Sequence, residues 1–288
     1  DRELREQLGR RGRRWVRTQR SWVELGKSIV ARYRSARAHY ERYLPTDAKS
    51  LSELRVGIIA DEFTSKTLAG SVNAVVLDRD SWQKQLEETD LDAVFIESAW
   101  EGNGGQWHRG VGYYGEEENA DLFRLITSCD ARGIPTIFWN KEDPVHFNRF
   151  RLTAARCTFV FTTDANMVVP YLSTEWSSTR VAASLPFYAQ PKIHNPLPGK
   201  ILYDNSAAYA GTYYGARYPE RSKTLAALLR TAKPLGLSIY DRQLAVTNSP
   251  YHFPREFAEN VRGVLPYDQV LDSYKSHLAQ LNVNSVEN

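Results

Sequence analysis

Short apolar runs that alternate with helical patterns restrict the possible folds of this chain more than any other feature. Uninterrupted apolar runs of this kind are typical of strands buried on both faces, which occur in parallel sheets covered by helices. The predicted strands of the first region are residues 55–60, 73–77, 93–96, 135–139, 158–162 and 181–185, and its predicted helices are 80–89, 117–132 (with Gly133 as the stop signal) and 145–155. This alternation predicts an α/β fold with a Rossmann-like domain over residues 54–185.

A proline-rich segment separates this region from a second one with the same alternation. Residues 186–199 contain four prolines and no periodicity, which predicts a linker. The predicted strands of the second region are 207–212, 237–241, 261–265 and 281–285, with one helix beginning near Tyr218 and another running from 267 to about 275. A doubly wound domain normally contains more strands than this. Residues 200–288 are therefore predicted to be an incomplete second Rossmann-like domain.

Residues 1–45 form a basic arm that differs from the rest of the chain. Residues 1–44 contain 13 Lys and Arg against 5 Asp and Glu, a net charge of +8, whereas the remaining residues carry −5. Apolar residues recur every seven positions with no intervening proline, at Leu8, Trp15, Trp22, Ile29, Ala36 and Tyr43. This periodicity predicts one long helix with an apolar seam, which ends at Pro45.

Three interpretations of the arm stay open. The helix packs on its own domain or on a second copy, it forms a coiled coil with a segment N-terminal to it, or it lies on an anionic membrane surface. A nucleic-acid partner is not predicted, because the basic charge is confined to the arm and the predicted domains are mildly acidic.

The chain lacks the motifs of several common enzyme classes. No GxGxxG, GxxxxGKS/T, HExxH or GxSxG motif occurs, which argues against nucleotide, zinc and serine hydrolases. Cys129 and Cys157 have no metal-ligand spacing and are predicted to be buried thiols. Neither a metal nor a cofactor is predicted. Without an apolar run long enough to span a bilayer and without a secretory signal, the predicted location is cytoplasmic, with peripheral contact at the inner membrane surface left open.

Acidic residues follow several predicted strands of the first domain at one edge of the sheet, where ligands bind in such folds. Carboxylates orient sugar hydroxyls or act as general bases, and aromatic rings stack on sugar faces. The candidate catalytic residues are Glu97, Glu142 and Asp61, and the candidate acceptor-binding residues are Trp100, Trp107, Lys141 and Asp143. Asp164 is interpreted as a helix N-cap, and Asp143 before Pro144 also fits a cap with proline at the first helical position.

The second domain has the features of an anion site. Gly211 ends its first strand, where a missing side chain lets a phosphate approach the backbone at the N-terminus of the next helix. Arg217, Arg221 and Arg242 are close enough in sequence to neutralise a diphosphate. The alternative for these arginines is a solvated helix face.

Several short sequence motifs resemble those of the spore-maturation (CgeB-like) glycosyltransferases, and the resemblance extends from Leu54 to the end. These motifs are Asp61-Glu-Phe63, Glu97-Ser-Ala-Trp100, Trp139-Asn-Lys-Glu-Asp-Pro144, Phe161-Thr-Thr-Asp164, Gln190-Pro-Lys-Ile-His-Asn-Pro196, Tyr218-Pro-Glu-Arg221, Tyr240-Asp-Arg242 and Leu281-Asn-Val-Asn-Ser285. The resemblance implies a GT-B fold, with an acceptor-binding N-terminal domain, a donor-binding C-terminal domain and a cleft between them. It also implies sugar transfer from a nucleotide-sugar to a cell-surface glycan or glycoconjugate, without an obligatory metal.

The same resemblance assigns residues to the two substrates. It puts Gly211, Tyr213, Arg221 and Arg242 on the donor side, and Asp61, Glu97, Lys141 and Glu142 on the acceptor side. Members of that family continue beyond the motif that ends at Ser285 into further donor-domain sequence, so this chain is expected to be cut within its donor domain. The expected function is glycosyl transfer in the interdomain cleft, with Glu97 or Glu142 as the base. The alternative is a glycan-binding or scaffolding protein that keeps the fold without catalysis.

Overall fold

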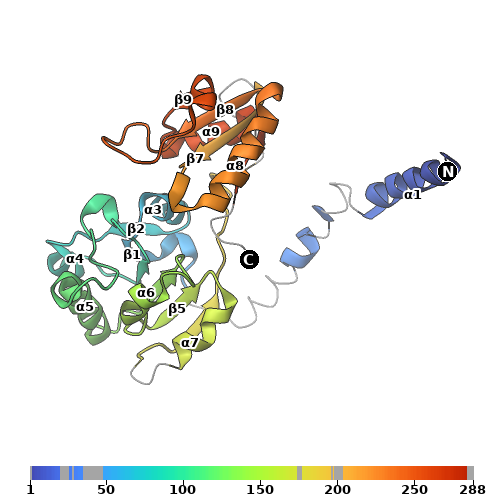
Figure 1. The fold of residues 1–288 in the computed structure, drawn as a ribbon. Coiled ribbons are helices and arrows are strands. Elements are labelled where there is room, and N and C mark those ends of the chain that lie inside the picture. Colours follow the sequence, from blue (N-terminus) through green and yellow to red (C-terminus); the bar gives the residue numbers. More distant parts are fainter. Residues whose placement is uncertain are drawn as a thin grey trace. The chain divides into compact units, whose positions relative to one another are not determined.

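The computed structural model describes residues 2–19, 26–27, 29–34, 48–173, 177–195, 197 and 204–283. The chain divides into two compact units, Asp1–Leu51 and Ser52–Asn288. The first unit contains α1 (Arg2–Gln19), and the second contains two parallel β-sheets of six and four strands (Figure 1). The predicted α/β fold with two Rossmann-like sheets is confirmed.

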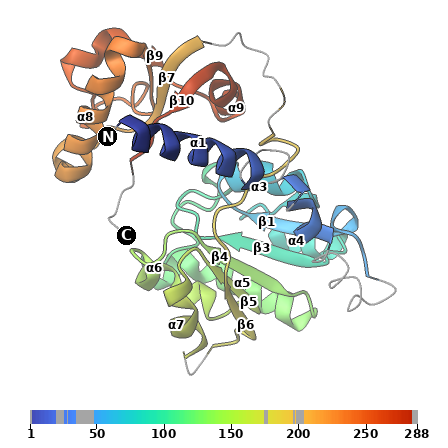
Figure 2. The same ribbon diagram turned by 90° about the vertical axis from the view of Figure 1, so that its right-hand side faces the viewer.

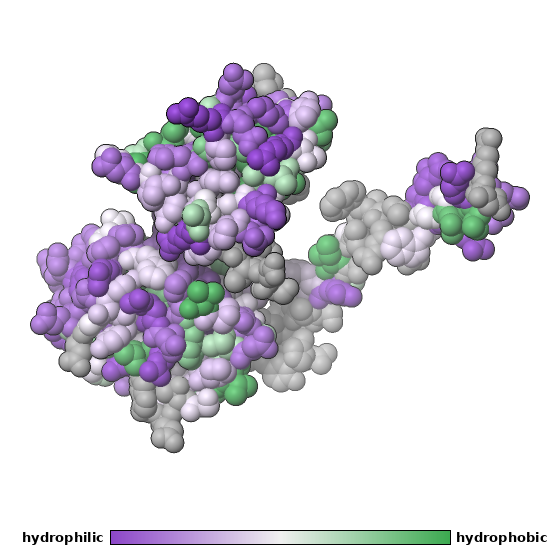
Figure 3. Space-filling view, viewed as in Figure 1, coloured by the Kyte–Doolittle hydropathy of each residue, from purple (hydrophilic) through white to green (hydrophobic). Residues whose placement is uncertain are grey.

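The described part of the basic arm is helical, as the periodicity predicted. Leu4, Leu8 and Trp15 are 53%, 57% and 53% exposed, and hydrophobic and hydrophilic side chains are both visible on α1 (Figure 3). The predicted continuation of the seam through Trp22, Ala36 and Tyr43, and the stop at Pro45, lie outside the described residues. No helix in the described part of the chain is both long and apolar enough to cross a bilayer.

The first sheet contains six parallel strands in the order β2-β1-β3-β4-β5-β6 (Figure 2). Its strands are β1 (Arg55–Ile59), β2 (Asn73–Val76), β3 (Ala93–Glu97), β4 (Thr136–Asn140), β5 (Phe159–Thr162) and β6 (Val181–Ser184). The connecting helices are α3 (Glu62–Ala69), α4 (Trp82–Glu88), α5 (Glu116–Ala131), α6 (Phe147–Ala154) and α7 (Val168–Leu172). Each connection joins parallel strands through a crossover, as in other open α/β sheets.

Helices cover both faces of this sheet. One hydrophobic core joins strand residues such as Ile96 and Phe138 to side chains of α4, α5, α6 and α7. The other face is covered by α3 and by the segment after β6, with Trp139 buried between them. This two-sided burial explains why the strands are apolar without alternation.

Two helices of the first domain were missed by the periodicity, and one predicted cap is wrong. α3 gives a weak apolar signal because its buried side chains are Thr64 and Thr67, and α7 has only five residues. α6 begins at Phe147 after His146, so Asp143 does not cap it. Asp164 does act as a cap, because its side chain accepts a hydrogen bond from the backbone N–H of Asn166.

The described part of the predicted linker is fixed to α3. Tyr188 Oη lies 3.0 Å from Thr67 Oγ1, and the buried Gln190 donates through Nε2 to Thr67 O and Ser71 Oγ, both at 2.8 Å. Trp139 Nε1 donates to Leu185 O at 2.9 Å. The chain therefore leaves the first domain along a defined path rather than as a free connector.

The second sheet has four parallel strands in the order β10-β7-β8-β9. The strands are β7 (Asp204–Gly211), β8 (Leu237–Asp241), β9 (Val261–Gly263) and β10 (His277–Gln280), with helices α8 (Pro219–Ala232) and α9 (Tyr267–Ser276). α8 packs on one face through Leu225, Ala226 and Leu229.

The last predicted strand, 281–285, is misplaced by four residues. β10 occupies 277–280 and follows α9 without a loop, while Leu281 and Val283 pack against the core beyond the strand. As an edge strand, β10 has an apolar side chain in Leu278 that is 64% exposed, so its sequence carries little of the pattern of a buried strand. Residues 284 and 285 lie outside the described residues.

Candidate functional site

The candidate site lies where the strand order of the first sheet reverses. The chain passes from β1 to β2 on one side and then crosses to β3 on the other side of β1. In open α/β sheets such a reversal leaves a crevice at the carboxyl ends of the strands, where ligands bind. Asp61 follows β1, Glu97 is the last residue of β3, and Lys141 and Glu142 follow the adjacent β4.

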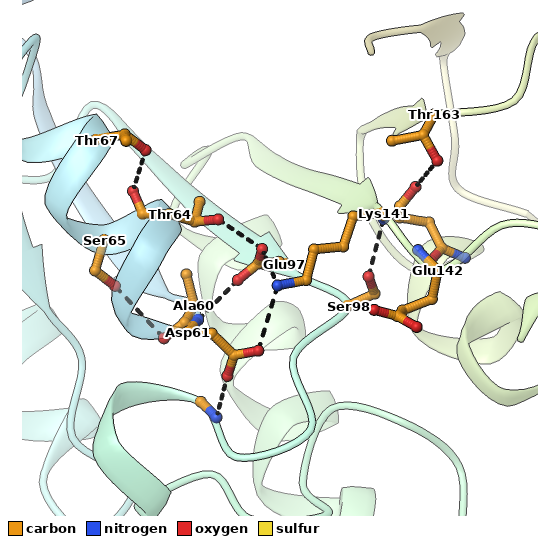
Figure 4. Close-up of polar contacts among 12 residues, drawn as sticks. Ala60, Asp61, Thr64, Ser65, Thr67, Glu97, Ser98, Lys141, Glu142 and Thr163 are labelled. Atoms are coloured by element: carbon orange, nitrogen blue, oxygen red, sulfur yellow. Dashed lines mark hydrogen bonds and ion pairs between the residues drawn. The ribbon is translucent and has the colours of Figure 1, made fainter. Parts of the chain in front are cut away.

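Glu97 is completely buried and fully hydrogen-bonded. Its Oε2 accepts from the backbone N–H of Asp61 at 2.7 Å, and its Oε1 accepts from Thr64 Oγ1 at 2.6 Å and lies 2.7 Å from Lys141 Nζ (Figure 4). The exposed fraction of Glu97 is 0%. The structure therefore corrects the expectation that Glu97 acts directly on an acceptor, since no part of its carboxylate is open to one.

Lys141 joins the buried Glu97 to the more open Asp61. Its ammonium lies 3.3 Å from Asp61 Oδ2, and the side chains of Lys141 and Asp61 are 15% and 28% exposed. Burial by itself lowers the pKa of Lys141, but the carboxylates of Glu97 and Asp61 outweigh that effect and raise the pKa above its ordinary value. Lys141 is therefore a fixed positive charge, and Asp61 is the partner through which this ion pair meets solvent.

Glu142 is held differently from Glu97. Its backbone N–H donates to Asn140 Oδ1 at 3.0 Å, and Trp100 is among the groups that lower the pKa of its side chain. Burial raises the pKa of Glu142, although Lys141, His146 and the Trp100 hydrogen bond act in the opposite direction. A half-buried carboxylate whose pKa is raised binds a proton more strongly than a solvated one, which suits a general base.

Asp143 stabilises the turn that carries Lys141 and Glu142. Its Oδ1 accepts from Asn140 Nδ2 at 2.8 Å, and its Oδ2 accepts from Thr162 Oγ1 at 2.7 Å and Tyr171 Oη at 2.8 Å. Tyr171 Oη also accepts from Asn140 Nδ2 at 2.8 Å. Burial raises the pKa of Asp143, and the two hydroxyl donors oppose this. With three side-chain donors already bound, Asp143 is a structural residue, which corrects its expected role as an acceptor ligand.

Tyr171→Phe is expected to lower the free energy of unfolding by about 1–2 kcal/mol, because it removes two buried hydrogen bonds of this network. Urea denaturation measures the change. The matched control is Tyr188→Phe, which removes a single, less buried hydroxyl contact with Thr67 and is expected to cost less. Equal losses in the two variants would show that the Tyr171 network adds nothing special to the turn.

The two tryptophans assigned to the acceptor have different positions. Trp107 is 0% exposed and donates from Nε1 to Leu77 O at 2.8 Å, so it belongs to the core and has no surface for a ligand. This corrects its expected role. Trp100 is half-buried, lies edge-on to His146 with ring centroids 5.0 Å apart, and is close enough to Glu142 to lower the pKa of that carboxyl.

A cleft of about 820 Å³ opens in front of these groups. Its lining includes the first-domain residues Asp61, Glu62, Phe63, Lys141 and Glu142, the segment residues Phe187 and His194, and the second-domain residues Tyr240, Arg242, Leu265, Val270 and Tyr274. The volume is within the usual range for small-molecule sites. Carboxylates, a cation and apolar rings thus meet in one space.

Of the expected donor-side residues, Arg242 alone lines this cleft. Among the described residues its guanidinium has no hydrogen bond or ion pair, so the group is available to an anion. Arg221 is engaged inside its domain, donating to Val283 O and Thr212 O at 3.3 Å and to Tyr209 Oη at 3.2 Å. Tyr213 is half-buried beside Phe253, with ring centroids 5.5 Å apart.

Gly211 has a reason for being glycine that involves no ligand. A Cβ at this position would lie 2.7 Å from Tyr209 Oη. The missing side chain therefore makes room for a buried tyrosine of the same strand, and the phosphate-binding role expected for Gly211 finds no separate support in the geometry.

Sequence reasoning missed the residues that support the site. Thr64 binds Glu97 from α3, and Thr162 and Tyr171 bind Asp143 from positions 19 and 28 residues further along the chain, respectively. Asn103 fixes the loop after β3, donating to Ile58 O and Leu77 O at 2.8 and 2.9 Å. The position of Asn103 between two glycines was the one sequence signal for this tight loop. Asn103 has a φ of 50°, a conformation that asparagine tolerates better than most residues.

Metal and thiol chemistry have no centre in the described part of the chain. No three His, Cys, Asp or Glu side chains converge there in a way that could hold a metal ion. Cys129 and Cys157 are buried, and burial raises the pKa of each thiol to about 12, so both are protonated at neutral pH.

Neither the models of known protein families nor the curated protein sequences give a match to this chain. Its assignment to a class therefore depends on the fold and on the cleft.

Proposed function

We propose that this protein is a glycosyltransferase of the GT-B type, which moves a sugar from a nucleotide-sugar to a hydroxyl of a cell-surface glycan or glycoconjugate. The observation that carries the proposal is the composition of the cleft. Glu142, with its raised pKa, lines it from the first sheet, and Arg242, which has no side-chain partner among the described residues, lines it from the second. A base beside one substrate and a cation beside the other are what transfer to a hydroxyl with loss of a diphosphate requires.

In the proposed reaction, Glu142 accepts the proton of the acceptor hydroxyl. The hydroxyl oxygen forms a bond to the anomeric carbon of the donor, and the bond from that carbon to the phosphate oxygen breaks. The electron pair leaves with the nucleoside diphosphate, whose charge Arg242 stabilises. Asp61 accepts a hydrogen bond from a second acceptor hydroxyl, and Lys141 holds Asp61 in place.

Arg242→Gln is expected to weaken the binding of nucleoside diphosphates about tenfold or more, because it removes a charge-assisted contact with the phosphates. Isothermal titration calorimetry with UDP, GDP, CDP and TDP measures the loss. Arg255→Gln is the matched control, since Arg255 is an exposed arginine of the same domain outside the cleft lining. Equal effects of the two substitutions would contradict the placement of the diphosphate at Arg242.

A glycan-binding or scaffolding role without catalysis is the second candidate. It is favoured by one observation, that Arg221 and Gly211 serve contacts within their own domain, which leaves few groups for a donor. Thermal-shift and calorimetric titration with UDP-, GDP-, CDP- and TDP-sugars separates the two. Binding of one nucleotide class supports the transferase, and a folded chain that binds none of them overturns it in favour of glycan binding.

A further inference from the structure

A second hollow, of about 280 Å³, lies beside the turn that carries Glu142. It is lined by Tyr113, Val145, His146, Asn148 and Arg149. Its volume is just below the range of pockets that hold drug-sized ligands, about 300–1,000 Å³. The hollow therefore has room for one ring-sized group, and it is separate from the residues that line the large cleft.

The side chains of this hollow combine apolar surface, neutral polar groups and the guanidinium of Arg149, which lies over the ring of Tyr114. Tyr113 and Val145 are 38% and 64% exposed, and the exposed Asn148 amide has no hydrogen-bond partner among the described residues. No carboxylate lines the hollow. A phenol ring next to an amide and an imidazole fits a neutral pyranose, whose ring faces are apolar and whose hydroxyls both donate and accept hydrogen bonds.

Contacts between Tyr113 and Arg149 hold one wall of the hollow in place. The backbone N–H of Tyr113 donates to Arg149 O at 2.7 Å, and Arg149 Nη1 donates back to Tyr113 O at 2.8 Å. The Arg149 guanidinium lies 4.2 Å from the ring centre of Tyr114. Because these contacts already fix the wall formed by Tyr113 and Arg149, less side-chain entropy is lost there when a ring binds, which favours weak ligands such as sugars.

One turn joins the hollow to the cleft. Lys141 and Glu142 line the cleft, Val145 and His146 line the hollow, and the backbone N–H of His146 donates to Glu142 O at 3.0 Å. A glycan whose reacting hydroxyl is at Glu142 would continue across Val145 into the hollow. We propose that the hollow is a second sugar subsite, which holds the unit next to the reacting one, so that the acceptor is an oligosaccharide. This inference deepens the proposed function and rests on it.

The test uses the intact chain with ¹³C-labelled valine methyl groups, and the Val145 signals are identified from a Val145→Ala spectrum. The probes are glucose, galactose, mannose and N-acetylglucosamine, and the disaccharides cellobiose, lactose and diacetylchitobiose, each titrated to about 100 mM. We expect at least one disaccharide to shift the Val145 signals to saturation, about fivefold more tightly than its monosaccharide. Asn148→Ala should remove that advantage, whereas Asn166→Ala, an exposed asparagine outside both hollows, should leave it unchanged.

Failure of the subsite and failure of the transferase give different results. A chain that binds a nucleotide-sugar but shows no response at Val145 to any probe, or a response that survives Asn148→Ala, overturns the subsite and leaves the transferase standing. A chain that binds disaccharides at Val145 but no nucleotide retains the hollow as a glycan site and loses the proposed reaction.

Discussion

Glu142→Gln is expected to lower kcat/KM for sugar transfer by about 100- to 10,000-fold, the usual contribution of a general base. The amide keeps the size of the side chain and the hydrogen-bonding capacity towards Trp100, but it cannot accept a proton. In the wild type the acid limb of kcat/KM should follow the ionisation of Glu142, above the ordinary value of 4.5 because burial raises this pKa. That limb should disappear from the residual activity of the variant.

The same substitution should slightly stabilise the fold at neutral pH. Because the pKa of Glu142 is higher in the folded state than in the unfolded chain, the folded state binds more protons in the interval between the two values. Stability therefore falls as pH rises through that interval, and the full cost is present above the raised pKa. Urea denaturation of Glu142→Gln and wild type should show a difference at pH 7 that vanishes below about pH 4.

Glu62→Gln is the matched control for both measurements. Glu62 also lines the cleft, but its side chain is 66% exposed and paired with Lys66 at 2.6 Å. The Glu62→Gln substitution should change turnover by only a small factor and leave the pH profile as in the wild type. If Glu62→Gln and Glu142→Gln lose activity to the same degree, the base is neither of them and the reaction needs another proton acceptor.

Lys141→Met should cause the largest loss of stability, about 3–5 kcal/mol, because it leaves the buried Glu97 carboxylate without its counter-charge. Two hydrogen bonds, from Asp61 N–H and Thr64 Oγ1, remain for Glu97 and do not replace the charge. Chemical denaturation at pH 7 measures the loss.

The double variant Lys141→Met with Glu97→Gln separates this account from a simple packing defect. Removing both charges eliminates the unpaired buried carboxylate, so the double variant should recover a substantial part of the stability lost by Lys141→Met. Losses that merely add would show that the two side chains do not act as a pair. Glu97→Gln alone is also expected to act through stability, because the carboxylate is inaccessible to substrate.

The location of the site could be predicted from the sequence, but the roles within it could not. Parallel strands all end at the same edge, so Asp61, Glu97 and Glu142 were expected at one edge of the sheet once the strands were recognised. Which carboxylate became buried depends on α3, a helix whose inward face consists of threonines and which therefore gives no apolar periodicity. Glu97 and Glu142 look equivalent in the sequence and differ entirely in hydrogen bonding.

Loop residues were harder still, because burial there depends on side chains that are distant in sequence. Trp107 looks like an exposed ring in a glycine-rich loop, yet its indole N–H satisfies the carbonyl of Leu77 at the end of the second strand. Tyr171 lies in a helix of five residues, too short for periodicity to register. The sequence does not distinguish Arg221 from Arg242. Only the structure shows that the Arg221 guanidinium is already bound to the carbonyls of Val283 and Thr212.

The two buried threonines of α3 connect the candidate site to the segment that follows the first sheet. Thr64 holds the carboxylate beneath the cleft, and Thr67, less than one turn away, contacts the Tyr188 hydroxyl and carries the carbonyl bound by Gln190. Because both sets of contacts are made by one eight-residue helix, the position of the buried carboxylate and the path of the connecting segment are fixed by the same element.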